Sequence, residues 1–72
     1  MSEREERWLE LAKKILQIEN ITLDARKENI EQWDSLAHVM LVSEFETEFH
    51  VSVPYEEIAH IGKLQDFVMY IR

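Results

Sequence analysis

The sequence predicts an all-α fold of three main helices and one short helix. Apolar residues recur at helical spacing in separate stretches, and no stretch competes with the alternation of apolar and polar residues typical of strands. The chain has 72 residues, of which 46% are hydrophobic, so it can build one small core but not two. We therefore expect residues 1–72 to form a single four-helix domain.

The first helix is expected to begin after Ser2. Ser2 and Glu5 have the spacing of a capping box, and the acids that surround Glu5 suit the positive end of a helix dipole. Apolar residues then follow the i, i+3, i+4, i+7, i+8 pattern, at Trp8, Leu11, Ala12, Ile15 and Leu16. From Glu19 to Trp33 the pattern breaks up, which predicts a long loop pinned to the core.

A second helix is expected from Ser35 to about Phe49, with Asp34 as its N-cap. Its apolar residues form two stripes on nearly opposite sides, one of Leu41, Val42, Phe45 and Phe49 and one of Leu36, Val39, Met40 and Ser43. The bulkier stripe with the two phenylalanines is the better candidate for the core. The other stripe is expected to be a contact surface, although burial in the core is the alternative for apolar residues at this spacing.

Two further helices complete the prediction. Pro54 suits the first position of a short helix from Tyr55 to His60, and Gly62 is placed to end it. The final helix would bury Leu64, Phe67, Val68 and Ile71, which again have helical spacing.

Charge and composition exclude several functions. A formal net charge of -7 repels phosphate backbones, so nucleic acid is not an expected partner. The chain has no cysteine, and its three histidines lack an i, i+4 pairing, so no metal site is predicted. Its start is charged, and no apolar stretch is long enough for a signal or membrane segment, so we expect a cytoplasmic protein without membrane insertion.

The segment Trp33-Asp34-Ser35-Leu36, at the start of the central helix after a long loop, resembles the acyl carrier protein family. Further similar segments are Glu46-Thr47-Glu48-Phe49, Val51-Ser52-Val53-Pro54, Glu56-Glu57-Ile58 and Leu64-Gln65-Asp66-Phe67-Val68, so the resemblance spans nearly the whole chain. In that family an Asp-Ser-Leu motif opens the second helix of a four-helix bundle, and its serine carries 4'-phosphopantetheine. The matching residue is Ser35, where the phosphodiester would lie at the positive end of a helix.

The resemblance also implies a function. A phosphopantetheinyl transferase would load the arm from coenzyme A, and acyl-loading and acyl-processing enzymes would use it to carry an acyl thioester. The chain itself would be no enzyme, and we expect a monomer. Residues around the second helix and at the start of the third would recognise partners: Asp34, Leu36, Ala37, Val39, Met40, Glu46, Glu56 and Glu57.

The chain departs from the family pattern at two positions. Carriers of fatty-acid synthesis typically have acids two and five residues after the serine, where this chain has Ala37 and Met40. The resemblance therefore implies a specialised pathway rather than housekeeping fatty-acid synthesis. Carriers of polyketide, aminoacyl or hydroxyacyl units in secondary metabolism are similar, including the tryptophan before Asp-Ser-Leu and the histidine three residues after the serine.

Two other functions stay open from the sequence. The chain would be a plain protein-interaction bundle if Ser35 is unmodified and the Leu36, Val39 and Met40 face binds a partner directly. It would be a small hydrolase if Ser35 and His38 formed a nucleophile and base with Asp34 as the orienting acid. We expect His38 instead to be a partly buried, hydrogen-bonded side chain, because it projects toward the core side of its helix.

Overall fold

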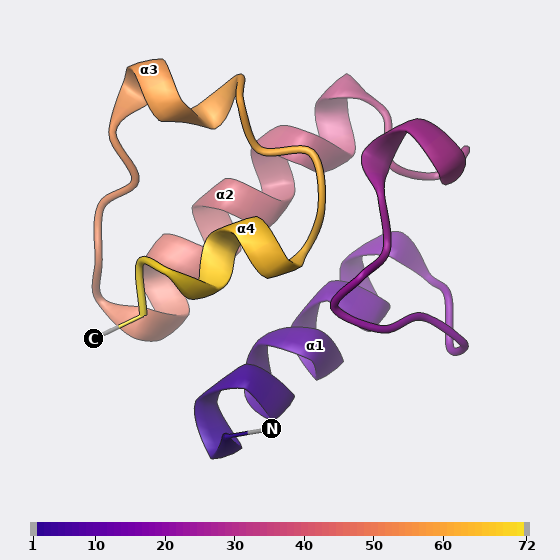
Figure 1. Ribbon diagram of the computed structural model, residues 1–72, viewed down its shortest axis with the longest axis horizontal. Helices are drawn as coiled ribbons and strands as arrows, with labels where there is room; N and C mark the ends of the chain where they lie inside the picture. The colour runs from indigo at the N-terminus through magenta and orange to yellow at the C-terminus, as the bar shows by residue number, and fades with distance from the viewer. Residues whose placement is uncertain (1, 72) are drawn as a thin grey trace.

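The computed structural model describes residues 2–71, and this part of the chain is entirely helix, turn and loop apart from one isolated bridge. In chain order the elements are α1 (Glu3–Leu16), the 3-10 helix η1 (Lys27–Asn29), α2 (Ser35–Phe49), α3 (Tyr55–Ile58) and α4 (Gln65–Val68) (Figure 1). The two long helices, α1 and α2, pack against each other. The predicted all-α class and its count of four α-helices are confirmed for the described residues.

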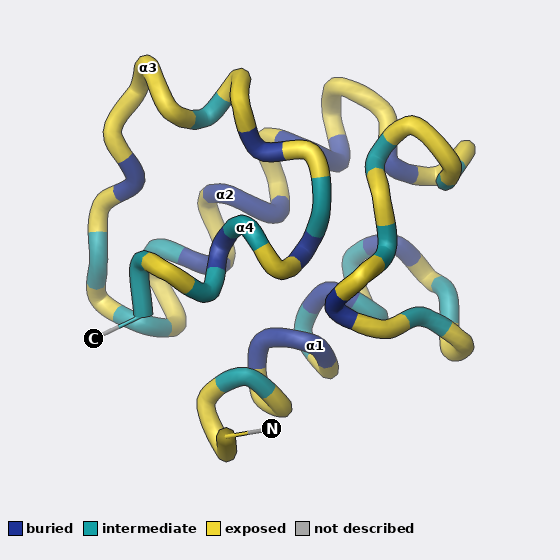
Figure 2. The backbone as a smooth tube through the Cα atoms, viewed as in Figure 1, coloured by how far each residue is buried: buried dark blue, intermediate teal, exposed yellow. Residues whose placement is uncertain are grey.

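Aromatic rings join α1, α2 and α4 into one core. The Trp8 ring lies 5.0 Å from the ring of Phe45 and 4.6 Å from that of Phe67, and its indole N–H donates to the Leu64 carbonyl at 3.1 Å. The predicted core stripe of α2 is confirmed, since Leu41, Val42 and Phe45 are buried and Phe49 is half-buried. Figure 2 shows that the buried segments of these elements face the middle of the molecule.

Each long helix begins where the sequence predicts. Ser2 and Glu5 form the full capping box, with the Glu5 N–H donating to Ser2 Oγ at 3.1 Å and the Ser2 N–H donating to Glu5 Oε1 at 2.9 Å. Asp34 caps α2 through its side chain. Both helices end at a residue in the left-handed region, Gln17 with φ 58° and His50 with φ 55°.

The last two helices are shorter than predicted. We expected α3 to reach His60 and the final helix to be a main one, but each is a single turn of four residues. Beyond each turn the chain continues with i+3 hydrogen bonds, such as Ile61 N–H to Ile58 O at 3.3 Å and Ile71 N–H to Val68 O at 3.1 Å. Tighter turns of this kind bury apolar residues at nearly the same spacing as an α-helix, which is why the apolar pattern overestimated both lengths.

The long loop between α1 and α2 is held against the segment before α4. Gln65 N–H donates to Leu23 O at 2.9 Å, Leu64 N–H to Ala25 O at 3.2 Å, and Lys27 N–H to Gly62 O at 2.8 Å. Leu23 and Trp33 are also buried. The prediction of a pinned loop is therefore confirmed, with the addition of η1.

Nowhere in residues 2–71 is there a helix with both the length and the apolar character needed to cross a bilayer.

Candidate functional site

The start of α2 presents a free serine hydroxyl. Asp34 Oδ1 accepts a hydrogen bond from the Ala37 N–H at 2.9 Å, so its carboxylate satisfies one of the unpaired amides of the first turn. Ser35 is the first residue of the helix and is exposed. Among the described residues none forms a hydrogen bond with its hydroxyl, and the first turn holds no acid. The hydroxyl is therefore accessible at the positive end of a helix.

His38 is buried and uses both ring nitrogens for structure. The Trp33 indole N–H donates to His38 Nδ1 at 3.0 Å, and His38 Nε2 lies 2.8 Å from the Ile58 carbonyl oxygen. Because an indole nitrogen only donates and a carbonyl oxygen only accepts, the imidazole is the neutral form with its hydrogen on Nε2. The expectation of a hydrogen-bonded histidine is confirmed.

This arrangement contradicts the hydrolase alternative. Asp34 is engaged with the backbone of its own helix, and both His38 nitrogens have other partners, so neither assists the Ser35 hydroxyl. A serine activated by a histidine needs a hydrogen bond between its hydroxyl and a ring nitrogen of that histidine. The chain of hydrogen bonds Trp33–His38–Ile58, here called the tether, joins the loop before α2, α2 itself and the end of α3.

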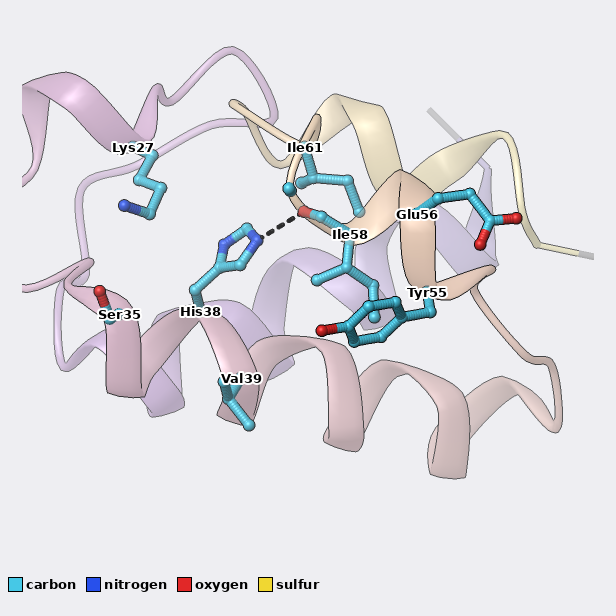
Figure 3. A pocket seen from close by; sticks show the side chains of 9 residues that line it. Lys27, Ser35, His38, Val39, Tyr55, Glu56, Ile58 and Ile61 are labelled. Atoms are coloured by element: carbon cyan, nitrogen blue, oxygen red, sulfur yellow. Dashed lines mark hydrogen bonds between the residues drawn. The ribbon is translucent and has the colours of Figure 1, made fainter.

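A hollow of about 480 Å³ opens beside Ser35, between α2, α3 and η1 (Figure 3). Its apolar lining includes Val39, Ile58 and Ile61. Its two charged residues come from opposite ends: Lys27 lies on the Ser35 side, and Glu56 lies beside Tyr55 on the far side. The hollow is thus an open surface groove with a cationic end next to the serine.

The apolar stripe that we predicted to be a contact surface is largely exposed. The exposed fractions are 69% for Leu36, 62% for Val39 and 45% for Met40. Ala37 is a correction to our set of partner-recognition residues, because it is only 8% exposed and belongs to the core. Its position one residue from the exposed stripe turns its side chain toward the inside of the helix pair.

The acidic residues differ in how far they are available to a partner. Glu46 is half-buried, and its Oε2 accepts a hydrogen bond from the Val53 N–H at 2.7 Å, so it holds the chain that follows α2. Glu48 lies 3.6 Å from Arg7 in an exposed ion pair. Glu56 and Glu57 are exposed at the start of α3.

Lys27 is the residue of this site that sequence reasoning missed. It belongs to η1, eight positions before Ser35, and only the pinning of the loop brings its side chain to the hollow. No motif surrounds it, so the local sequence offers no signal for this placement.

Comparisons with known proteins identify the family. No protein-family model and no solved structure matches the chain. It is 44% identical over 55 residues to proteins named "Acyl carrier protein" from Rickettsia bellii strains RML369-C and OSU 85-389. The match covers 76% of this chain, and the chain spans 64% of the length of the first and 68% of the length of the second. The chain belongs to the acyl carrier protein family, whose members are non-catalytic carriers.

Proposed function

We propose that this protein carries an acyl group as a thioester on a 4'-phosphopantetheine arm attached to Ser35. The observation that supports this most directly is the exposed hydroxyl of Ser35 at the first residue of α2, which forms no hydrogen bond within residues 2–71. The arm would supply the thiol that a cysteine-free chain lacks. Residues 1–72 would act as one domain and as a cytoplasmic monomer.

Loading would use the features of the helix start. A phosphopantetheinyl transferase would join Ser35 Oγ to the phosphorus that bears the pantetheine part of coenzyme A. The diphosphate bond would break, adenosine 3',5'-bisphosphate would leave, and the hydroxyl proton would go to a base of the transferase. The new phosphodiester keeps one negative charge, which the amides and the dipole at the start of α2 favour.

The test is the intact mass of the protein after incubation with coenzyme A, magnesium and a broad-specificity phosphopantetheinyl transferase. We expect the mass of one phosphopantetheine to be added to the unmutated protein and to Ser43→Ala, but not to Ser35→Ala. Ser43 is a matched control because it is an exposed serine of the same helix. Absence of any addition to the folded protein with several transferases would refute the proposal and favour the protein-interaction bundle.

We further propose that the partners are enzymes of a specialised pathway, such as polyketide-type secondary metabolism, rather than of fatty-acid synthesis. The surface next to Ser35 is apolar, with Leu36, Val39 and Met40 exposed, and the acids of α2 begin only at Glu44. Partners that dock there would bury apolar surface around the serine, and the more distant acids would contribute mainly to association rates. Among the acids outside the apolar face, Glu56 and Glu57 at the start of α3 are the best candidates for contact with a partner, because both are exposed.

A Met40→Glu variant tests this choice of pathway. If the apolar face selects dedicated partners, the variant loses recognition by them and gains recognition by acyl-transfer enzymes of fatty-acid synthesis. Ser52→Glu adds the same charge to an exposed residue in the connection after α2, outside the face, and should change neither rate. Efficient acylation of the unmutated, loaded protein by fatty-acid enzymes, with no effect of Met40→Glu, would contradict the proposal.

A further inference from the structure

Lys27 is held at the Ser35 end of the hollow by its backbone. Its N–H donates to the Gly62 carbonyl at 2.8 Å, and the neighbouring Arg26 forms a bridge with Lys63. These contacts fix where the side chain of Lys27 leaves the loop. In Figure 3 this side chain lies on the same side of the hollow as the Ser35 hydroxyl, and its ammonium group is turned toward that side.

The charge of Lys27 is not used within the protein. Within residues 2–71 no carboxylate forms an ion pair with its ammonium group, although the chain has almost twice as many acids as bases. Its neighbour Arg26 differs, because it approaches Glu28 at 3.9 Å and does not line the hollow beside Ser35. Lys27 is also half-buried, so part of its hydration is already lost.

We propose that Lys27 pairs with the phosphodiester that joins the arm to Ser35, an inference that rests on the proposed function. The start of α2 would hold two negative charges, the phosphodiester and the Asp34 carboxylate, and the ammonium group would offset one of them. No other residue of the hollow offers such a cation, since both His38 ring nitrogens are occupied and Glu56 is acidic. Lys27 is thus a positioning residue, which turns the first part of the arm toward the groove.

Pairing with Lys27 would give the arm a preferred direction. From the phosphodiester, the arm would run over the apolar wall formed by Val39, Ile58 and Ile61. The dimethyl group of pantetheine is apolar and would bury surface against this wall. Without Lys27 the same arm would leave Ser35 in many directions, because the helix start alone attracts the charge but does not orient the chain beyond it.

The experiment compares the loaded forms of three proteins by ³¹P NMR and by ¹⁵N relaxation of the pantetheine amides. They are the unmutated protein, Lys27→Gln and Arg26→Gln, each first checked for folding by circular dichroism and for loading by intact mass. Arg26→Gln is the matched control, because it removes one positive charge from the adjacent residue. We expect Lys27→Gln to shift the phosphorus resonance and increase the mobility of the arm, and Arg26→Gln to leave both unchanged.

Salt provides a second test, made on the loaded unmutated protein and compared with the Lys27 variants. Raising the ionic strength from about 0.01 M to about 1 M shortens the Debye length from about 30 Å to about 3 Å. The phosphorus resonance of the unmutated protein should then move toward that of Lys27→Gln, whereas Lys27→Arg at low salt should stay near the unmutated position.

The two proposals fail in different ways. If Ser35 takes up no arm, the proposed function fails before Lys27 is tested. If Ser35 is loaded but Lys27→Gln and Arg26→Gln give the same phosphorus resonance and arm mobility, the pairing with Lys27 is wrong and the carrier function stands. A phosphorus resonance of the unmutated protein that does not respond to salt would overturn the pairing in the same way.

Discussion

The starts of α1 and α2 have the same type of cap and opposite surroundings. At α1 the hydroxyl of Ser2 is used by the capping box, and the first turn holds the acids Glu3, Glu5 and Glu6. At α2 the cap is Asp34, the serine that follows has a free hydroxyl, and the first turn holds no acid. Lys27, a cation with no ion pair among the described residues, lies beside this second start.

The difference supports our proposal that the start of α2, and not that of α1, receives the arm. A helix dipole favours negative charge at either start, but α1 already meets this preference with its own side chains. At α2 the preference is met only in part, by Asp34, and an additional anion on Ser35 would complete it. Capping thus stabilises both helices, and under our proposal only the start of α2 receives a covalently attached phosphate.

The largest effect should come from the tether, which exists only at α2. In His38→Ala the buried Trp33 indole N–H loses its acceptor and α3 loses its link to α2. An unpaired buried donor costs about 1–3 kcal/mol, and the cavity adds to this, so we expect the free energy of unfolding to fall by about 2 kcal/mol or more. Urea denaturation measures the change.

The control for the tether is His60→Ala. His60 is an exposed histidine just after α3, so its removal should change the free energy of unfolding by less than about 0.5 kcal/mol. Equal and small effects of the two substitutions would mean that the tether does not hold α3.

The two caps should have similar effects on stability and different effects on loading. Ser2→Ala and Asp34→Ala each remove a side-chain cap and should each cost about 1 kcal/mol. Asp34→Asn keeps a capping oxygen and should recover most of that loss. Ser2→Ala should be loaded at the unmutated rate by the transferase, whereas Asp34→Ala should be loaded more slowly, and equal loading rates would show that the cap does not help to present Ser35.

The smallest effect should come from giving α2 the acidic first turn of α1. Leu36 is exposed, so Leu36→Glu places an acid in that turn without disturbing the core. It should stabilise the protein by about 0.3–1 kcal/mol through the dipole, and at the same time slow loading because it competes with the incoming phosphate. Leu36→Gln is the uncharged control, and faster loading of the glutamate variant would contradict this interpretation.

The sequence was sufficient for the parts of the fold that depend on local rules. The bounds of α2, Ser35–Phe49, follow from the Asp34 cap and from the pattern of its two apolar stripes. The lengths of α3 and α4 were wrong, because apolar spacing does not distinguish an α-helical turn from the i+3 turns that replace it. Leu9 also joins the core outside the predicted stripe.

The site was predictable only in part, for a related reason. The motif led us to propose Ser35 and indicated the exposed positions around it, and the helix geometry indicated a buried His38. The partners of His38 and the place of Lys27 depend on how the loop and α3 fold back onto α2, which no short segment encodes. Ala37 shows that the family pattern alone does not predict exposure, since this position of the pattern is buried in this chain.

The most direct test of the contrast between the two helix starts is to map the modified residue. The unmutated protein is loaded by a phosphopantetheinyl transferase, digested, and analysed by fragmentation mass spectrometry. We expect one phosphopantetheine on the peptide that contains Ser35, localised to its hydroxyl, and none on the peptide that contains Ser2. Modification of another serine, or a folded protein that remains unmodified, would contradict the claim that the start of α2 is the attachment site.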